Sequence, residues 1–377
     1  MSTVPGIVID HVPASTGIYI GSPGLAVLPN GDYIASHDEF GPKSTEHTKA
    51  VSHVFRSKDK GKSWEKIATI NGAFWSNLFV HKKALYLLGT DRHHGNVVLH
   101  KSTDGGEGWT SVILRGEGEY HCAPVPILEH KGRLWRAFEW RNPPQAWGIN
   151  YRAGVLSVPV NADLIEPKNW SATNFLPSDR GWNSGDMGAW LEGNVVVAPD
   201  GSLVNILRVQ TKSPDEKAAW VTISEDGKAA SFDPATGFFA FPGGAKKFAI
   251  RWDKKSKRYW SLASIVGEKF RASDPGKVRN TLALTSSANL RDWEVRSVIL
   301  SHPDTIHHGF QYVEWLFEGN DIIAACRTAY DDDFGGAHNN HDANFLTFHR
   351  IASFRQKVGS SRGILLHTGV TALQAKA

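Results

Sequence analysis

Histidine, arginine, asparagine and tryptophan recur at the ends of short apolar runs along this sequence. Those at the beginnings of runs include Trp75, Asn77, Tyr120, His121, Asn194, Lys247 and His308, and those at the far ends include His37, His93, His94, Arg208, Arg327 and Tyr330. A later polar loop adds His338 and His341. Arginine pairs with a carboxylate through two N–H groups, and histidine exchanges protons near neutral pH. Gathered at one place, such side chains suit the recognition of an anionic sugar.

The apolar runs that must position these residues have the form of β-hairpins. Each consists of a strand, a polar turn containing Gly, Asn or Asp, and a second strand. Six such hairpins begin near Gly24, Ser76, Ala123, Gly193, Lys247 and Gly309. Together with 36 glycines and 14 tryptophans, they predict an all-β protein.

Two turns share a motif that predicts the fold. Residues 57–64 read Ser-x-Asp-x-Gly-x-Ser-Trp, and residues 102–109 match except for Gly108 at the hydroxyl position. In this Asp-box the Asp accepts backbone N–H groups and the Gly takes a positive φ. Trp64 and Trp109 are 45 residues apart, and a four-stranded propeller blade spans ~40–50 residues. Asn169-Trp170 and Asp292-Trp293 are weaker copies of the turn.

The spacing predicts a seven-bladed β-propeller, with six blades as the alternative. The six hairpins supply six blades, and the strand-like ends 6–21 and 363–373 would form a seventh blade shared by both termini. Residues 1–377 are then a single domain, closed by its N- and C-terminal strands, which removes exposed sheet edges.

Composition excludes several classes of function. A net charge of +4 from dispersed residues does not indicate nucleic acid binding, and no apolar run approaches the ~20 residues of a membrane span. The only cysteines, Cys122 and Cys326, lie in apolar runs and are expected to be buried thiols. The first residues lack a signal peptide pattern, so the chain is either cytosolic or a mature secreted form. We expect a monomer.

Four segments resemble a known group of proteins. The runs "YHCAPVPILEHKGRLWRAFE", "WLEGNVVVAPDGSLVNILRV", "KKFAIRWDKKSKRYW" and "AHNNHDANFLTFHRI" resemble sialidase-like propellers that act on uronic-acid glycans. These are the ulvan lyases and, more closely, the L-rhamnose-α-1,4-D-glucuronate lyases. The resemblance covers most of residues 20–352 and favours seven blades. It implies a secreted polysaccharide lyase that releases terminal rhamnose from arabinogalactan protein or gum arabic.

The implied reaction, β-elimination at a 4-substituted uronic acid, sets three chemical tasks. The C6 carboxylate must be neutralised, the C5 proton removed and the O4 leaving group protonated. Matching the family motifs makes His121 the base or acid and Arg208 the carboxylate ligand, with Tyr120, Asn194 and His37 as further candidates. The sugar-binding residues would be Trp75, Asn77, His93, His94, Asn194, Lys247, Arg327 and Tyr330. The two adjacent histidines at 93–94 depart from the family pattern and leave the substrate open.

Other functions fit the same scaffold. An exo-glycoside hydrolase, sialidase-like or an α-L-rhamnosidase, is one alternative, although no Phe/Tyr-Arg-Ile-Pro segment typical of sialidases is present. A non-catalytic glycan-binding propeller is the other. The chemistry requires no cofactor, but His308, His338 and His341 could hold a zinc ion, or nearby aspartates a calcium ion.

Overall fold

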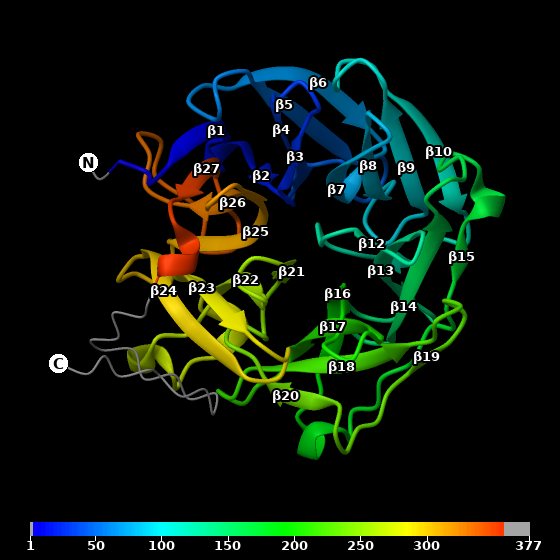
Figure 1. Ribbon diagram of the computed structural model, residues 1–377. Helices are drawn as coiled ribbons and strands as arrows, with labels where there is room; N and C mark the ends of the chain where they lie inside the picture. Colours follow the sequence, from blue (N-terminus) through cyan, green and yellow to red (C-terminus); the bar gives the residue numbers. More distant parts are fainter. Residues whose placement is uncertain (1–2, 358–377) are drawn as a thin grey trace. The chain divides into compact units, whose positions relative to one another are not determined.

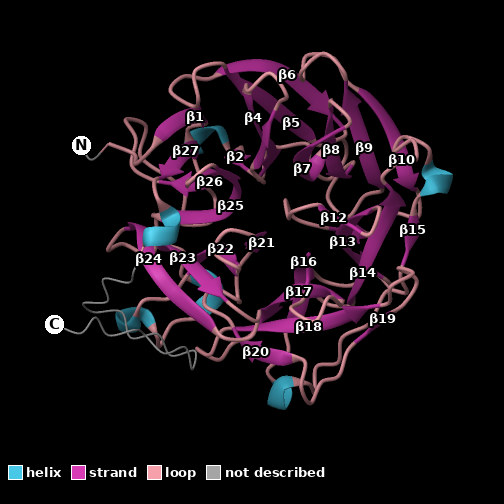
Figure 2. Ribbon diagram, in the orientation of Figure 1, coloured by secondary structure: helices cyan, strands magenta, loops and turns pink. Residues whose placement is uncertain are grey.

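The computed structural model describes residues 3–357 of the chain. Over this range the regular structure is almost entirely β-strand, and the helices are short 3-10 turns (Figure 2). These turns are η1 (Ala14–Thr16), η2 (Pro167–Asn169), η3 (Asn183–Gly185), η4 (Glu268–Phe270), η5 (Pro275–Lys277) and η6 (Phe354–Gln356). No helix in the described part of the chain is long and apolar enough to cross a membrane.

The chain divides into two compact units. Unit 1 comprises residues 3–124, 163–168 and 304–352, and unit 2 comprises residues 125–162, 169–303 and 353–357. Within the described residues, each unit contains three antiparallel sheets. The prediction that the whole chain is one domain stays a prediction.

Unit 1 contains the first strands of the chain and the last described ones. One sheet has the order β2-β4-β5-β6, with β3 also pairing with β4: β2 (Tyr19–Ile20), β3 (Gly24–Val27), β4 (Tyr33–Phe40), β5 (Val51–Ser57) and β6 (Glu65–Asn71). The second has the order β10-β9-β8-β7: β7 (Phe74–His81), β8 (Ala84–Thr90), β9 (Val97–Ser102) and β10 (Thr110–Arg115). The third has the order β1-β27-β26-β25: β1 (Ile7–His11), β25 (Gly309–Glu318), β26 (Asp321–Ala329) and β27 (Phe345–Ile351). The short strand β11 (Tyr120–His121) also belongs to this unit.

Unit 2 contains the middle of the chain. Its first sheet joins β12 (Leu128–His130), β13 (Arg133–Arg141), β14 (Tyr151–Pro159) and β15 (Ser171–Ala172). Its second has the order β16-β17-β18-β19, with β20 also on β18: β16 (Ala189–Val197), β17 (Leu203–Gln210), β18 (Lys217–Ile223), β19 (Ala230–Ser231) and β20 (Phe238–Ala240). Its third has the order β21-β22-β23-β24: β21 (Phe248–Asp253), β22 (Arg258–Ser264), β23 (Thr281–Ser287) and β24 (Trp293–Ser301).

The fold class is an all-β propeller with six blades among the described residues. The prediction of seven blades is wrong, and the six-blade alternative is confirmed. The reason is the N-terminal strand: β1 pairs with β27 and completes the sheet of β25 and β26 instead of beginning a seventh (Figure 1). The segment 363–373, which was predicted to contribute to that blade, lies outside the described residues.

The two predicted Asp-boxes form turns between the third and fourth strands of their sheets. Asp59 Oδ1 accepts the backbone N–H groups of Lys62 and Ser63 at 3.0 and 2.9 Å, and Gly61 has φ 89°. Asp104 binds the backbone of the β9–β10 turn in the same way. Hydrogen bonds from the Ser63 side chain and backbone lower the pKa of Asp59 to about 2.

Degenerate forms of the turn stand at the same place in unit 2. Between β23 and β24, Asn289 replaces Asp, and its Oδ1 accepts the N–H groups of Arg291 and Asp292 at 2.9 and 2.8 Å. Between β18 and β19, Ser224 donates to Asp226 at 2.6 Å. Similar hydrogen-bonded turns therefore form where the sequence matches the Asp-box motif only in part.

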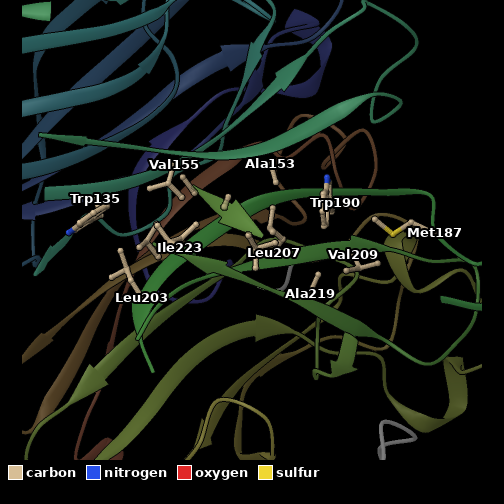
Figure 3. Close-up of a cluster of buried hydrophobic side chains, with 14 residues drawn as sticks. Trp135, Ala153, Val155, Met187, Trp190, Leu203, Leu207, Val209, Ala219 and Ile223 are labelled. Atoms are coloured by element: carbon tan, nitrogen blue, oxygen red, sulfur yellow. The ribbon is translucent and has the colours of Figure 1, made fainter. Parts of the chain in front are cut away.

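The hydrophobic core of unit 2 fills the space between neighbouring sheets. Figure 3 shows one cluster, in which side chains of β13 and β14 pack against those of β16, β17 and β18. Trp135 and Trp190 are almost completely buried in it. Burial of a large apolar side chain contributes roughly 1.5–3 kcal/mol, so such clusters supply the rigid support from which the strand ends project.

Candidate active site

Three sheets share a distortion near the start of their first strand. Trp75 in β7, Glu192 in β16 and Tyr312 in β25 each lie in a β-bulge, where the pairing register shifts. All three have positive φ, at 49°, 56° and 51°. Positive φ is uncommon for residues other than glycine and often marks functional positions, and bulges redirect side chains beside active sites.

Two arginines occupy equivalent positions next to the bulges of their own sheets. Arg208 on β17 faces Leu191, and Arg327 on β26 faces Gln311, in the last pair before each bulge. Both arginines are buried, at 4% exposure. They belong to different units, so each is described with its own neighbours.

Four aromatic side chains of unit 1 come together around the first bulge. The Trp75 ring lies 4.4 Å from the His121 ring and 4.7 Å from the His93 ring, measured between centroids. His94 is 4.4 Å from His93 and 5.6 Å from Trp75. His121 is buried, whereas the other three are partly exposed. The sequence predicted all four as site residues, and the structure brings them into contact.

Backbone contacts hold Trp75 in place. Its N–H donates to the Asp38 carboxylate, and its carbonyl accepts from the Cys122 thiol at 3.3 Å. Cys122 and Cys326 are buried thiols, as predicted. The strained Trp75 backbone is therefore fixed at both ends.

The loop that carries His93 and His94 is equally well fixed. Asp91 accepts hydrogen bonds from the backbone and the side chain of Asn96 at 2.9 and 2.8 Å. The backbone N–H of His93 donates to the carbonyl of Glu46 at 2.7 Å. His94 has φ 51°. These bonds fix the backbone of the loop that carries both histidines.

Tyr120 and Asn77 flank the cluster but are buried. The Tyr120 hydroxyl accepts from Arg115 Nε at 2.6 Å and lies 3.3 Å from Glu117, and burial raises its pKa. Asn77 follows the bulge of β7 and is 1% exposed. The catalytic role predicted for Tyr120 and the sugar contact predicted for Asn77 stay predictions.

His37 is enclosed between two oxygen acceptors. Its Nε2 lies 2.8 Å from the Asp10 carboxylate and its Nδ1 lies 3.0 Å from the carbonyl of Asp38. The His37 side chain has no exposed surface. This geometry ties β4 to β1, and the predicted catalytic role of His37 stays a prediction.

Asp38 is a buried carboxylate next to the cluster. Burial raises its pKa to about 6, although the N–H groups of Ser22 and Trp75 and the charges of His37 and Arg327 act in the opposite direction. A carboxyl group with a pKa near neutrality can serve as a general acid or base.

Arg327 lies near Asp38 in unit 1, close enough for its charge to lower the pKa of that carboxyl group. Its guanidinium stands 4.3 Å from the Phe40 ring centroid and 5.0 Å from that of Tyr312. It also donates to the carbonyl of His341 through Nη2 at 2.5 Å. The sugar contact predicted for Arg327 stays a prediction.

The histidines predicted to hold a metal have separate surroundings. His308 lies 2.9 Å from Asp304, and its ring stands edge-on to that of Tyr330 at 4.8 Å. His338 stacks on Tyr19 at 5.6 Å, while His341 lies 2.8 Å from its neighbour Asp342. The group of described residues whose ligand atoms do converge is Glu46, His47 and His93.

In unit 2, the predicted carboxylate ligand already has a carboxylate partner. Arg208 Nη1 lies 2.9 Å from Glu192 Oε2, and Nε donates to the carbonyl of Ala245 at 2.9 Å. Asn194 is completely buried and bonds the backbone of β21 through both amide atoms, at Phe248 and Ile250. That geometry fits a contact between sheets, and the sugar contact predicted for Asn194 stays a prediction.

Lys247 lies beside a buried ion pair of unit 2. It is 2% exposed, and its neighbour Lys246 is fully buried with Nζ 2.5 Å from Glu216 Oε1. Burial lowers the pKa of Lys246, while the charge of Glu216 opposes that change. The predicted role of Lys247 stays a prediction.

Sequence reasoning left three residues of unit 1 out of the predicted site. Asp38 follows His37 in an apolar strand, and a charged residue in such a strand is a signal that could have identified it. Glu46 and His47 lie in the polar loop between β4 and β5, far in sequence from His93. No local pattern links them, so only the tertiary structure identifies them.

A separate cavity of about 600 Å³ lies in unit 2. Its lining includes Phe270, Asn280, Thr281 and His302. None of the residues predicted from the sequence lines it. It also lacks the converging histidines of the Trp75 cluster, which consists of Trp75, His93, His94 and His121. We therefore place the candidate site at that cluster.

Comparison with known proteins supports the fold. No protein-family model and no curated protein sequence matches the chain. Among solved structures, the α-L-arabinanase of Penicillium chrysogenum, complexed with arabinobiose, has a TM-score of 0.58 at 16% identity, with 95% of this chain and 100% of the arabinanase covered. The Hadza microbial sialidase Hz136 has a TM-score of 0.62 at 12% identity, covering 92% of this chain and 68% of the sialidase.

A third similar structure is another carbohydrate-active enzyme. The α-L-arabinofuranosidase Arb93A of Fusarium graminearum has a TM-score of 0.58 at 10% identity, with 93% of this chain and 98% of that protein covered. At such identities the likeness establishes the propeller fold, and a shared fold does not by itself assign an activity.

Proposed function

We propose that this protein is a carbohydrate-active enzyme that cleaves the bond to O4 of a glucuronic acid by β-elimination. The observation that carries the proposal is the contact of Trp75 with His93, His94 and His121. A tryptophan face can hold a sugar ring, and imidazoles can exchange protons with it at neutral pH. The contact thus combines binding and proton transfer at one place.

In this proposal, two histidines of the cluster carry out the two proton transfers. His121 is buried against Trp75, and His94 is partly exposed. We assign proton removal at C5 and proton donation to O4 to these two histidines, without choosing which does which. Rigid placement of both rings favours such a reaction, because catalysis depends on orientation.

The sequence assigns the third task, neutralisation of the substrate carboxylate, to Arg208 of unit 2, and this role stays a prediction. That assignment rests on the resemblance to uronate lyases. In the structure Arg208 binds Glu192, so a uronate would have to share this guanidinium with an internal carboxylate. An arginine has five N–H donors, which makes such sharing chemically reasonable.

We further propose that the substrate is a glycan capped by L-rhamnose on glucuronic acid, as in arabinogalactan protein or gum arabic. The small positive net charge of +4 agrees with an anionic glycan. A polymeric substrate of this kind would be met outside the cell, so we also propose a secreted enzyme.

Incubation with gum arabic tests the proposal directly. We expect released rhamnose together with rising ultraviolet absorbance, because β-elimination leaves an unsaturated uronate. His121→Ala should reduce the rate by roughly 10²–10⁴-fold, the usual contribution of a general acid or base. His81→Ala, which removes a histidine at the far end of β7, is the control and should retain activity. The proposal would be contradicted if neither released rhamnose nor the rise in absorbance were found with any of several uronate glycans.

Hydrolysis is the second candidate, and Asp38 is the observation that favours it. A buried carboxyl group with a pKa raised to about 6 resembles the general acid of a glycosidase. The arabinanase, the sialidase and the arabinofuranosidase with similar folds carry hydrolase names. Rhamnose or another sugar released without the ultraviolet signal, and lost in Asp38→Asn, would identify this reaction instead.

A further inference from the structure

We infer that Glu46, His47 and His93 form a binding site for a divalent transition metal ion such as zinc. Glu46 Oε1 lies 3.0 Å from His47 Nε2 and 3.6 Å from His93 Nδ1. The three ligand atoms all lie within 4.8 Å of one another. All three residues belong to unit 1, and the inference does not depend on which sugar bond the protein cleaves.

Two of the three separations are close to those of ligands around one small ion. Zinc binds histidine nitrogen and carboxylate oxygen at about 2.0–2.2 Å in a tetrahedral arrangement, which places neighbouring ligand atoms about 3.3 Å apart. The two separations measured from Glu46 Oε1 lie on either side of this value. An ion could therefore enter with small side-chain movements.

His93 supplies an independent indication. Its Nδ1 is buried and has no hydrogen-bond partner among the described residues. The Glu46 oxygen, at 3.6 Å, is too far for a good hydrogen bond. Buried polar atoms are nearly always satisfied, and a metal ion between this nitrogen and the carboxylate would satisfy it.

Two of the three ligands are held in place by the backbone. The second carboxylate oxygen of Glu46 accepts the N–H of Gly41 at 3.2 Å, and the Glu46 carbonyl accepts the N–H of His93 at 2.7 Å. Such outer contacts orient metal ligands. The His47 side chain is 70% exposed, so it is free to complete the site when an ion arrives.

The donor set selects the kind of ion. Two imidazoles and one carboxylate suit zinc and its neighbours among the transition metals, whereas calcium and magnesium require mainly oxygen ligands. Three protein ligands leave one tetrahedral position for water or for an oxygen of a bound molecule. This site differs in every residue from the group predicted at His308, His338 and His341.

A bound ion would also restrain the Trp75 cluster. The His93 ring lies 4.7 Å from Trp75 and 4.4 Å from His94. Metal coordination through Nδ1 would fix the His93 ring and with it one wall of the cluster. Glu46 and His47 come from the β4–β5 loop, so the ion would join two loops of unit 1.

Titration of the metal-stripped full chain with Zn²⁺ alone, by calorimetry, tests the inference. We expect one zinc ion per chain, and a tetrahedral Co²⁺ derivative with intense visible absorption. Glu46→Gln, His47→Ala and His93→Ala should each weaken Zn²⁺ binding by at least ~100-fold, because loss of outer-shell partners alone costs about 10–100-fold. Circular dichroism of the stripped variants checks that they remain folded.

His81→Ala is the matched control, since it removes a histidine of unit 1, at the end of β7, that belongs to neither group of possible metal ligands. Its zinc affinity should equal that of the wild type. Absence of zinc binding, equal binding by all the variants, or loss of binding in His81→Ala would each overturn the inference. Because the readout is metal binding, failure here leaves the proposed reaction untouched.

Discussion

Asp38 shows how strongly a single residue responds to its surroundings. It lies in β4 and is completely enclosed, while the N–H groups of Ser22 and Trp75 point at its carboxylate. Burial raises its pKa from 3.8 to about 6 despite these bonds and the nearby charges of His37 and Arg327. The group therefore titrates close to neutrality, where a catalytic acid is most useful.

This raised pKa predicts a specific dependence of stability on pH. The native state holds the Asp38 proton more tightly than the unfolded chain does. Its contribution to stability is complete below pH 3.8 and is lost as the pH rises through about 6. Asp38→Asn cannot ionise, so its stability relative to wild type should improve by up to about 3 kcal/mol between pH ~4 and pH ~7.

Urea denaturation of both proteins across this pH range measures the effect. The difference between the two free energies of unfolding is the quantity to follow, since other carboxylates titrate equally in both. Parallel curves would show that Asp38 is ionised throughout and would remove the support for its role as an acid.

At the scale of secondary structure, the β-bulges redirect side chains out of the regular alternation of a strand. In β16 the bulge lies at Glu192, whose carboxylate meets Arg208 on β17 at 2.9 Å. Both side chains are almost completely buried, at 5% exposure for Arg208 and 1% for Glu192. Burying two charges is costly, and the pair is tolerated because each neutralises the other.

Removal of one partner should therefore destabilise the folded protein strongly. We predict that Arg208→Ala lowers the free energy of unfolding by about 3–5 kcal/mol, because it removes the buried guanidinium that pairs with Glu192. Replacing both with apolar residues, as in Glu192→Leu with Arg208→Met, should recover much of this loss. Chemical denaturation gives both values.

An exposed ion pair provides the comparison for Arg208. Lys58 lies 3.3 Å from Glu65, with both side chains more than half exposed, and Lys58→Ala should change stability by less than about 1 kcal/mol. If Arg208→Ala were equally mild, the Arg208–Glu192 pair would not stabilise the fold, and a purely substrate-binding role for Arg208 would gain support.

At the scale of the whole molecule, the N-terminal strand completes the last blade. β1 pairs with β27 from the other end of the described chain. Two side-chain hydrogen bonds at 2.8 Å reinforce it, between His11 and Asp332 and between His37 and Asp10. The strand thereby covers an edge of β27 that would otherwise offer unpaired N–H and C=O groups.

Deletion of β1 should therefore affect both stability and solubility. A chain beginning at Val12 should unfold at lower denaturant concentration and associate, since the exposed β27 edge can pair with other molecules. Size-exclusion chromatography with light scattering detects the association. A chain beginning at Gly6 retains the strand and should behave as wild type, and monomeric, fully stable protein from both truncations would contradict the prediction.

Much of this architecture could be predicted because its signals are local. Alternating apolar runs and turn residues indicate the six hairpins, and Asp59 and Asp104 form their turns from residues within a few positions. Trp75 and His121 were predicted to belong to one site, since each stands beside the beginning of an inner hairpin. Such features depend on short-range sterics and hydrogen bonds, which the order of residues alone determines.

What only the tertiary structure decided depends on contacts between distant segments. The protein has six blades among the described residues instead of the predicted seven because β1 pairs with β27. No local pattern specifies this pairing. The raised pKa of Asp38 arises from enclosure by the backbone around Ser22 and Trp75, and the convergence of Glu46 and His47 with His93 arises from the meeting of two loops. The sequence by itself determined the class of fold and many of the chemical groups, whereas the environment that sets their reactivity arises only when the chain has packed, because burial and charge act across space and not along the chain.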